Sequence, residues 1–65
     1  MCESRVIVLF KGEERVYEEI ACLVLEDRAL TLVDINGKRH RVEGFTRALR
    51  VEADFLKHTV RVVLE

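Results

Sequence analysis

The chain has 65 residues, and a domain of that length buries only about 60% of the surface that its unfolded chain exposes. Its composition, 49% hydrophobic and 35% charged, is that of an ordinary folded protein and excludes an intrinsically disordered chain. A formal net charge of -1 provides no long-range attraction to nucleic acid or to anionic lipid, so neither is expected as a partner.

Most segments alternate apolar and polar residues with the two-residue period of a strand, and no stretch sustains helical spacing over three turns. The first predicted strand, "ESRVIVLF" at 3–10, places Val6, Val8 and Phe10 on one face. A turn, "KGEE", follows. The other five predicted strands cover 15–26, 29–35, 39–43, 45–53 and 59–65.

Asn36 and Gly37 lie between the third and fourth predicted strands. Both residue types accept the positive φ that a two-residue type I′ turn requires, so a tight hairpin is expected there. The fourth strand, "RHRVE", is short and polar, which is typical of a sheet edge that must resist pairing with other chains. In the last strand, Val60, Val62 and Leu64 are predicted to face the core.

Segment 46–57, "TRALRVEADFLK", has a helical alternative. A helix would align Leu49, Ala53 and Leu56 on one stripe, whereas a strand would alternate Leu49, Val51 and Ala53 with charged residues. The β-branched Val51 favours the strand.

Six short strands spaced about ten residues apart are typical of a small, strongly bent antiparallel barrel of the SH3-like or Sm-like type. We therefore expect an all-β fold and a single domain over residues 1–65. A domain this small commonly needs a disulfide, a metal or a second copy of itself. Two cysteines are too few for a disulfide scaffold, and no signal segment or membrane-spanning apolar run is recognisable, so we expect a cytoplasmic protein.

Cys2 directly follows Met1, at a position where a thiol gains less from burial than from its chemistry. The terminal amine, the amide nitrogen of Cys2 and its thiolate can close two adjacent five-membered rings around one metal ion. If Met1 is removed, the amine and thiolate of Cys2 still close one ring. Square-planar nitrogen and sulfur donors suit Ni(II) or Cu(II) better than zinc. The sequence therefore predicts a metal site formed by Met1 and Cys2; the alternative is a cysteine without function at a frayed end.

Two such N-terminal chelates, related by a twofold axis, would complete a four-coordinate site with one ion per dimer. Metal binding would then be linked to the homodimer that the short chain already suggests.

The other candidate ligands have structural interpretations. Cys22, within the apolar run "IACLVLE", is predicted to lie in the core. His40 is expected to be neutral and exposed, because neighbouring cations disfavour a second positive charge. His58 is predicted to hydrogen-bond Asp54 and close the last turn, rather than to bind metal.

Neither nucleic-acid binding nor catalysis has a strong signal. The basic cluster Lys38, Arg39, His40 and Arg41 has no interleaved aromatic residue, so a solvated hairpin explains it better than an RNA site. The chain has no serine–histidine pairing and no glycine-rich phosphate loop, and no enzymatic activity is expected.

Several short motifs carry a family resemblance. The chain opens with Met-Cys-Glu, continues through a valine-rich strand, and contains "DINGK" at 34–38 and "VEG" at 42–44. It closes with Asp54, His58 and "VVLE". Over essentially its whole length it resembles the CooT family of small nickel-binding proteins; Cys22 is not part of that pattern.

The resemblance implies a homodimer of small β-barrels that holds Ni(II) at the dimer interface through the cysteine that is Cys2 here. It also implies nickel delivery to a client such as carbon monoxide dehydrogenase during its maturation. Family members have been labelled RNA-binding as well, which the charge of this chain does not support. The alternative function is a small β-barrel module that binds RNA or a protein without metal. A third is a structural subunit of a larger complex, which would expose a large apolar patch.

Overall fold

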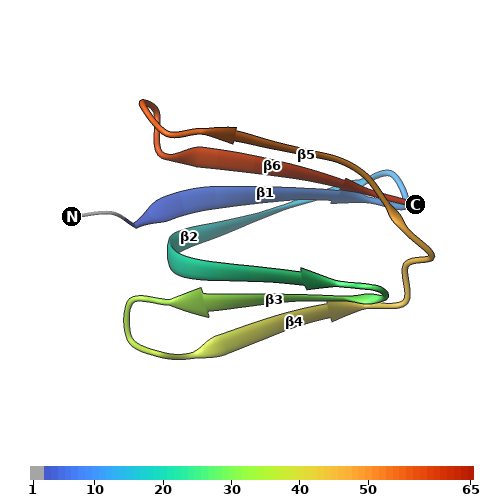
Figure 1. Ribbon diagram of the computed structural model, residues 1–65, viewed down its shortest axis with the longest axis horizontal. Coiled ribbons are helices and arrows are strands. Elements are labelled where there is room, and N and C mark those ends of the chain that lie inside the picture. The colour runs from blue at the N-terminus through green and yellow to red at the C-terminus, as the bar shows by residue number, and fades with distance from the viewer. Residues whose placement is uncertain (1–2) are drawn as a thin grey trace.

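The computed structural model describes residues 3–65 and folds them into an all-β structure (Figure 1). The predicted all-β class is confirmed, and each predicted strand corresponds to an observed one. The helical alternative for 46–57 is wrong, because a strand and a turn occupy that segment. No helix that could cross a membrane occurs in the described part of the chain. In chain order the strands are β1 (Ser4–Phe10), β2 (Glu13–Glu26), β3 (Ala29–Asp34), β4 (Arg39–Glu43), β5 (Ala48–Asp54) and β6 (Thr59–Leu64).

The strands form one mixed sheet in the order β4-β3-β2-β1-β6-β5. All neighbours pair antiparallel except β1 and β6, which run parallel, so the wholly antiparallel prediction is wrong for this pair. The cause is the connection at 44–47, which carries the chain from β4 at one edge to β5 at the other. The hairpin that follows then delivers β6 beside β1 in the same direction. Since β4 and β5 each have a single neighbour in the described sheet, the sheet is not closed.

Strand β2 bends sharply because two β-bulges insert extra residues into it. One lies opposite Ser4 and Val6 of β1, and the other lies between Ile20 and Cys22. Glu19, within the first bulge, has a φ of 57°, which a non-glycine residue rarely adopts. Bulges increase the twist and bend of a strand. The first half of β2 therefore pairs with β1 and its second half with β3, and the sheet folds over into two layers (Figure 1).

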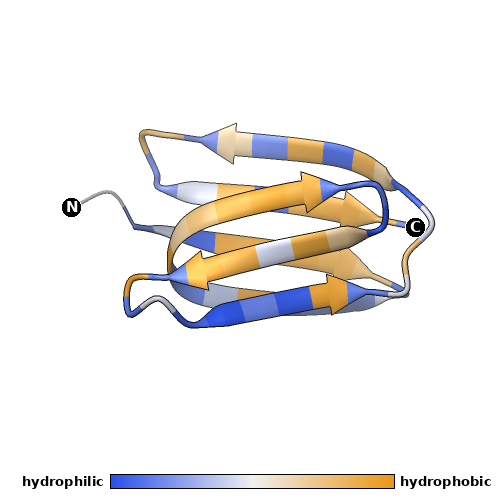
Figure 2. Ribbon diagram, turned by 60° about the horizontal axis from the view of Figure 1, so that its bottom comes forward, coloured by the Kyte–Doolittle hydropathy of each residue, from blue (hydrophilic) through white to orange (hydrophobic). Residues whose placement is uncertain are grey.

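The core lies between these two layers. Hydrophobic residues are present in all six strands (Figure 2), and alternate residues point inward, as the two-residue period predicts. The inward orientation predicted for the last strand is confirmed, since Val62 and Leu64 are buried and Val60 packs against the core. Val6 and Val8, which were predicted to share one face of the first strand, are both buried. The complete buried cluster is Val6, Val8, Ile20, Leu30, Leu32, Val42, Phe45, Val62 and Leu64.

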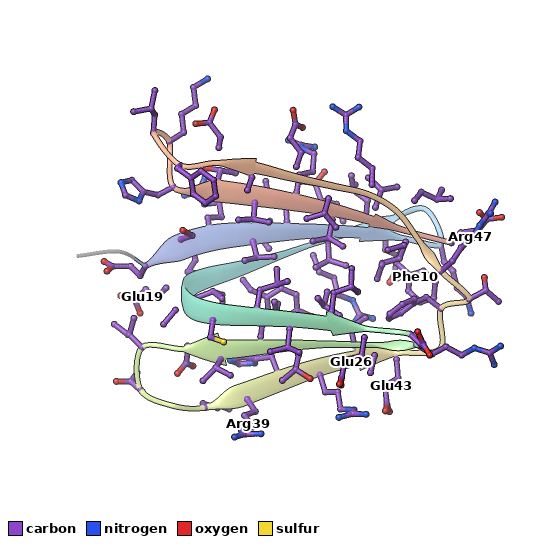
Figure 3. All side chains as sticks on the ribbon, in the orientation of Figure 1. Phe10, Glu19, Glu26, Arg39, Glu43 and Arg47 are labelled. Carbon is purple, nitrogen blue, oxygen red and sulfur yellow. The ribbon has the colours of Figure 1, made fainter. Side chains whose placement is uncertain are left out.

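The two ends of the folded sheet differ. At the end where the chain finishes, Phe45 packs edge-on against Phe10 with ring centroids 6.3 Å apart; Figure 3 labels Phe10 at this end. There the carbonyl oxygen of Glu65 accepts hydrogen bonds from the backbone N–H groups of Thr46 and Arg47, and its own N–H donates to the carbonyl oxygen of Arg47, which covers this end of the core. The beginning of β1 and the β3–β4 and β5–β6 turns lie at the opposite end (Figure 1).

The β3–β4 turn is not the predicted type I′ turn. Gly37 has a φ of 84°, but Asn36 has no positive φ, and four residues separate the strands. The reason is the carboxylate of Asp34, whose Oδ1 accepts hydrogen bonds from the backbone N–H groups of Asn36 (2.9 Å) and Lys38 (3.0 Å). The side chain therefore stabilises a longer Asx-type turn.

Candidate functional site

The predicted metal ligands, Met1 and Cys2, lie outside the described residues. The position of the next residues is defined. Where β1 begins, the backbone N–H of Arg5 donates a hydrogen bond to the carbonyl oxygen of His58 (2.8 Å). The beginning of β1 is therefore fixed beside the β5–β6 turn.

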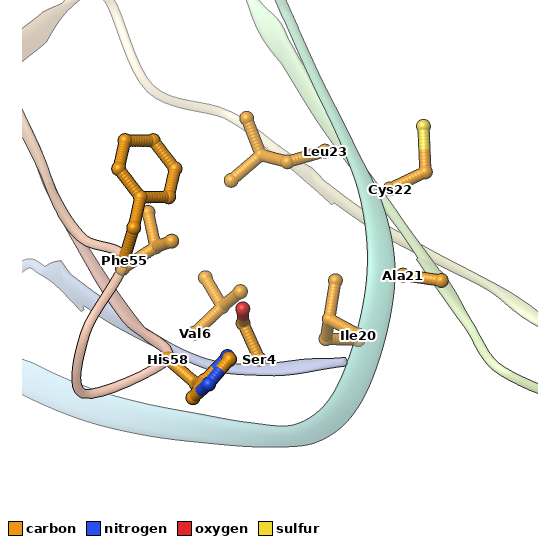
Figure 4. Close-up of a pocket in the computed structure, with 9 residues that line it drawn as sticks. Ser4, Val6, Ile20, Ala21, Cys22, Leu23, Phe55 and His58 are labelled. Atoms are coloured by element: carbon orange, nitrogen blue, oxygen red, sulfur yellow. The ribbon is translucent and has the colours of Figure 1, made fainter. Parts of the chain in front are cut away.

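An apolar pocket of about 400 Å³ opens beside the beginning of β1 (Figure 4). Its apolar lining comes from β1, β2, β6 and the β5–β6 turn. Val6 and Ile20 are also buried core residues, so the pocket is an open end of the core. The apolar residues that line it include Val6, Ile20, Leu23, Phe55 and Val60.

The β5–β6 turn presents large apolar side chains to solvent at this opening. Phe55, which lines the pocket, is 84% exposed, and its neighbour Leu56 is 94% exposed. Exposed apolar side chains beside an apolar pocket are typical of a surface that binds a partner. The sequence analysis treated this segment only as a turn and did not identify the surface. The available signal was a Phe-Leu pair at positions where turn residues are usually polar.

A polar recess adjoins the apolar pocket, and Ser4 and His58 line both. The recess also includes Glu3, whose Oε1 atom is buried and has no hydrogen-bond partner among the described residues. Burial of an acceptor without a partner is unfavourable. Glu3 therefore offers an unused carboxylate oxygen immediately after Cys2 in the chain. Within residues 3–65, no group of three His, Cys, Asp or Glu side chains could hold a metal ion.

The core location predicted for Cys22 is wrong. Its thiol is free and the residue is exposed. The bulge between Ile20 and Cys22 shifts the alternation by one residue, so Leu23 rather than Cys22 follows Ile20 on the core side. In Figure 4, Cys22 lies on the opposite side of the β2 ribbon from Phe55 and Val6.

The exposed position predicted for His40 is also wrong. The residue is half-buried, its Nε2 atom lies 3.2 Å from Oδ2 of Asp34, and its ring lies 5.7 Å from that of Tyr17. The hydrogen bond with His40 lowers the pKa of the Asp34 carboxyl below its ordinary value, and the backbone N–H groups of Lys38 and Asn36 contribute in the same direction. This pair stabilises a turn at the same end of the sheet as the pocket.

The hydrogen bond predicted between Asp54 and His58 does not form. Asp54 does stabilise the last turn, but its Oδ1 accepts from the backbone N–H groups of Leu56 (3.1 Å) and Lys57 (3.0 Å). His58 has a φ of 52° and directs its side chain to the pocket and the recess. A positive φ at histidine is uncommon and costs of order 1–2 kcal/mol.

Two residues of the basic cluster, both on β4, form ion pairs or hydrogen bonds with acidic side chains. Arg41 lies 2.7 Å from Glu43, and His40 pairs with Asp34. Figure 3 shows Arg39 and Glu43 on the outer side of β4, where both are solvated. The interpretation as a solvated hairpin is consistent with these pairs.

Comparison with protein-family models, with curated proteins and with solved structures gives no match to this chain.

Proposed function

We propose that this protein is a non-enzymatic nickel-binding accessory protein that carries Ni(II) as cargo at the interface of a homodimer. The thiolate of Cys2 is the main donor, with the nitrogens of Met1 and Cys2 completing the chelate. In this proposal the cytoplasmic protein delivers nickel to a client such as carbon monoxide dehydrogenase. The proposal extends the likeness of the sequence to the CooT family.

The observation that supports the proposal best is the apolar pocket beside the beginning of β1. Ser4, two residues after Cys2, lines this pocket, and the exposed Phe55 stands at its opening. An apolar surface at that place would allow a second copy to pack against the end of the sheet from which the chain begins. Two N-terminal segments would then be close enough for one ion to bind both.

Glu3 and His58 give the proposed site additional donors. The buried Oε1 of Glu3 has no partner among the described residues, and the imidazole of His58 borders the same recess. Nitrogen and sulfur donors favour Ni(II), while a weaker carboxylate ligand would allow release. Transfer of the ion to a client would require that the N-terminal donors can be reached from solvent.

The proposal includes the small SH3-like or Sm-like barrel expected from sequence. Its support is the number of strands and the bent β2, which both layers share. In the described chain the sheet stays open between β4 and β5.

A nickel titration followed by thiolate-to-metal charge-transfer absorption tests this function. Cys2→Ser should abolish the absorption. Cys22→Ser should retain it, because the proposed site does not use the Cys22 thiol, although Cys22 is among the residues that line the pocket. Saturation is expected at one ion per two chains. Absence of the band in the unmodified protein, or its equal loss in both variants, would refute the assignment.

The alternative is a module that binds a protein or RNA without metal. The exposed apolar pocket would suit a protein partner, while the paired charges on β4 favour RNA less. Salt-dependent RNA binding that persists in Cys2→Ser would support this alternative.

A further inference from the structure

Strand β5 is an exposed edge of the sheet whose core-side residues are not covered. Val51 is paired with the fully buried Val62 of β6 and so points to the core side, yet it is 46% exposed. Ala53, on the same side, is exposed as well. Edge strands are usually protected by charged residues, proline, an inward charge or a β-bulge. The register of β5 shifts between Ala48 and Arg50, but residues 50–54 pair regularly with β6, contain no lysine or proline, and place the apolar Val51 and Ala53 on the inward side. This part of the edge and its apolar side are therefore free to pair with a partner strand.

The charges along β5 indicate which partner fits. Arg50 and Glu52 lie on the outer side, on either side of Val51, with opposite signs (Figure 2 shows the alternation). If β5 pairs antiparallel with β5 of a second copy about a twofold axis at Val51, each Arg50 faces a Glu52 of the other copy.

Other registers are disfavoured. A shift that centres the axis on Arg50 places the two arginines opposite each other, and one centred on Glu52 places the two glutamates opposite each other. A register shifted by one residue would put the apolar side of one β5 strand on the same face of the joined sheet as the charged, outer side of the other. The sequence Arg-Val-Glu therefore selects one self-pairing.

The opposite edge, β4, provides a comparison within the same chain. It carries the same triplet, Arg41-Val42-Glu43. In each triplet the arginine pairs with the glutamate of its own strand, at 2.7 Å between Arg41 and Glu43 and at 3.4 Å between Arg50 and Glu52. Its central residue Val42 is only 5% exposed, so self-pairing of β4 would bury little additional apolar surface. The charge pattern is common to both edges, but the uncovered valine is found on β5.

We propose that β5 is a self-association edge, which pairs antiparallel with β5 of a second copy and continues the sheet across two chains. This surface is separate from the apolar pocket. Two strand spacings of about 4.8 Å lie between β5 and β1, so an axis at Val51 does not bring the beginnings of the two β1 strands together. The inference does not depend on nickel, and Ni(II) bound as proposed above would link one β5 pair to another.

The first test is sedimentation analysis of the full chain with a chelator present, so that metal does not contribute. The unmodified protein should be a dimer. Arg50→Glu and Glu52→Arg should each weaken it by about tenfold or more, because two attractive cross-strand pairs become repulsive. The double variant Arg50→Glu/Glu52→Arg restores opposite charges and should dimerise as the unmodified protein does. Glu43→Arg on β4 is the matched control and should have no effect.

The second test is disulfide cross-linking in a Cys2→Ser/Cys22→Ser background. In the proposed register residue 51 faces itself, with Cα atoms about 4.5–5.5 Å apart, a distance that a disulfide can span. Val51→Cys should therefore form a covalent dimer on mild oxidation, and Ala53→Cys should not. A monomeric unmodified protein, equal weakening by Glu43→Arg, or equal cross-linking at both positions would overturn the proposal.

Discussion

The imidazole Nε2 of His40 lies 3.2 Å from Oδ2 of Asp34, and the other carboxylate oxygen of Asp34 accepts two backbone hydrogen bonds within the β3–β4 turn. One ionised carboxylate thus connects the strand β4 to the turn that precedes it. Because these hydrogen bonds favour the charged form, the pKa of Asp34 lies below its ordinary value of 3.8, with His40 as the largest cause.

Asp34→Asn should reduce the loss of stability in acid. A carboxyl whose pKa is lower in the folded than in the unfolded chain stabilises the fold above the unfolded pKa. This contribution disappears as the pH falls below about 4, through the lower folded value. Urea unfolding between pH 7 and pH 2.5 should show a shallower acid dependence in the variant. An identical dependence in both proteins would contradict this role for Asp34.

Leu32→Ala should be severely destabilising. Leu32 has no exposed surface, and removal of a fully buried leucine side chain costs about 2–5 kcal/mol. A domain of this size has a total stability of roughly 3–10 kcal/mol, so much of the variant should be unfolded at 25 °C. Leu56→Ala, at a residue that is 94% exposed, is the control and should leave the urea midpoint unchanged. Similar midpoints for the two variants would show that Leu32 is not a core residue.

Gly44→Ala should destabilise the fold through the backbone alone. Gly44 has a φ of 93°, and an added Cβ would meet no atom within 4 Å, so no steric clash contributes. Occupation of this region by alanine costs about 1–2 kcal/mol. Gly44→Asn should cost less, because asparagine tolerates positive φ better. Equal thermal midpoints for the glycine and alanine proteins would be inconsistent with the observed conformation.

The thiol of Cys22 should react without denaturant. In Cys2→Ser, where Cys22 is the remaining cysteine, a disulfide reagent such as 5,5′-dithiobis(2-nitrobenzoate) should titrate one thiol per folded chain. The rate at which Cys22 reacts with the reagent should be similar without urea and in urea. If the reaction requires unfolding, the bulge does not direct Cys22 outward.

The strand segments could be predicted from sequence because alternation and turn residues are local signals. Val62 and Leu64 point inward because residues two apart share one face. The same rule misplaced Cys22, since a bulge adds one residue to β2 and no local pattern identifies it. The two-residue period also did not predict that Val51, on the core side of β5, would remain partly exposed. Its exposure depends on which strands lie at the edges of the sheet.

The turns were less predictable than the strands. The pair Asn36-Gly37 indicated a two-residue turn. Instead, the carboxylate of Asp34 accepts hydrogen bonds from the backbone and stabilises a longer turn. The parallel pairing of β1 with β6 depends on the crossing at 44–47 and has no local signature. For the candidate site, the sequence predicted Met1 and Cys2 as ligands, which lie outside the described residues. The pocket beside the beginning of β1 could not be predicted, because strands distant in the sequence form it.

The pairing of β1 with β6 has a kinetic consequence. Of the described strands, the first, β1, is completed only by the last, β6, since Arg5 pairs with Thr59 and Leu9 with Val63. During translation, the backbone hydrogen-bonding groups on the β6 side of β1 have no strand partner until β6 has emerged from the ribosome. Contacts between segments so far apart in sequence slow folding, often to milliseconds or longer. Nascent chains of this protein should therefore complete the sheet only after β6 has emerged from the ribosome.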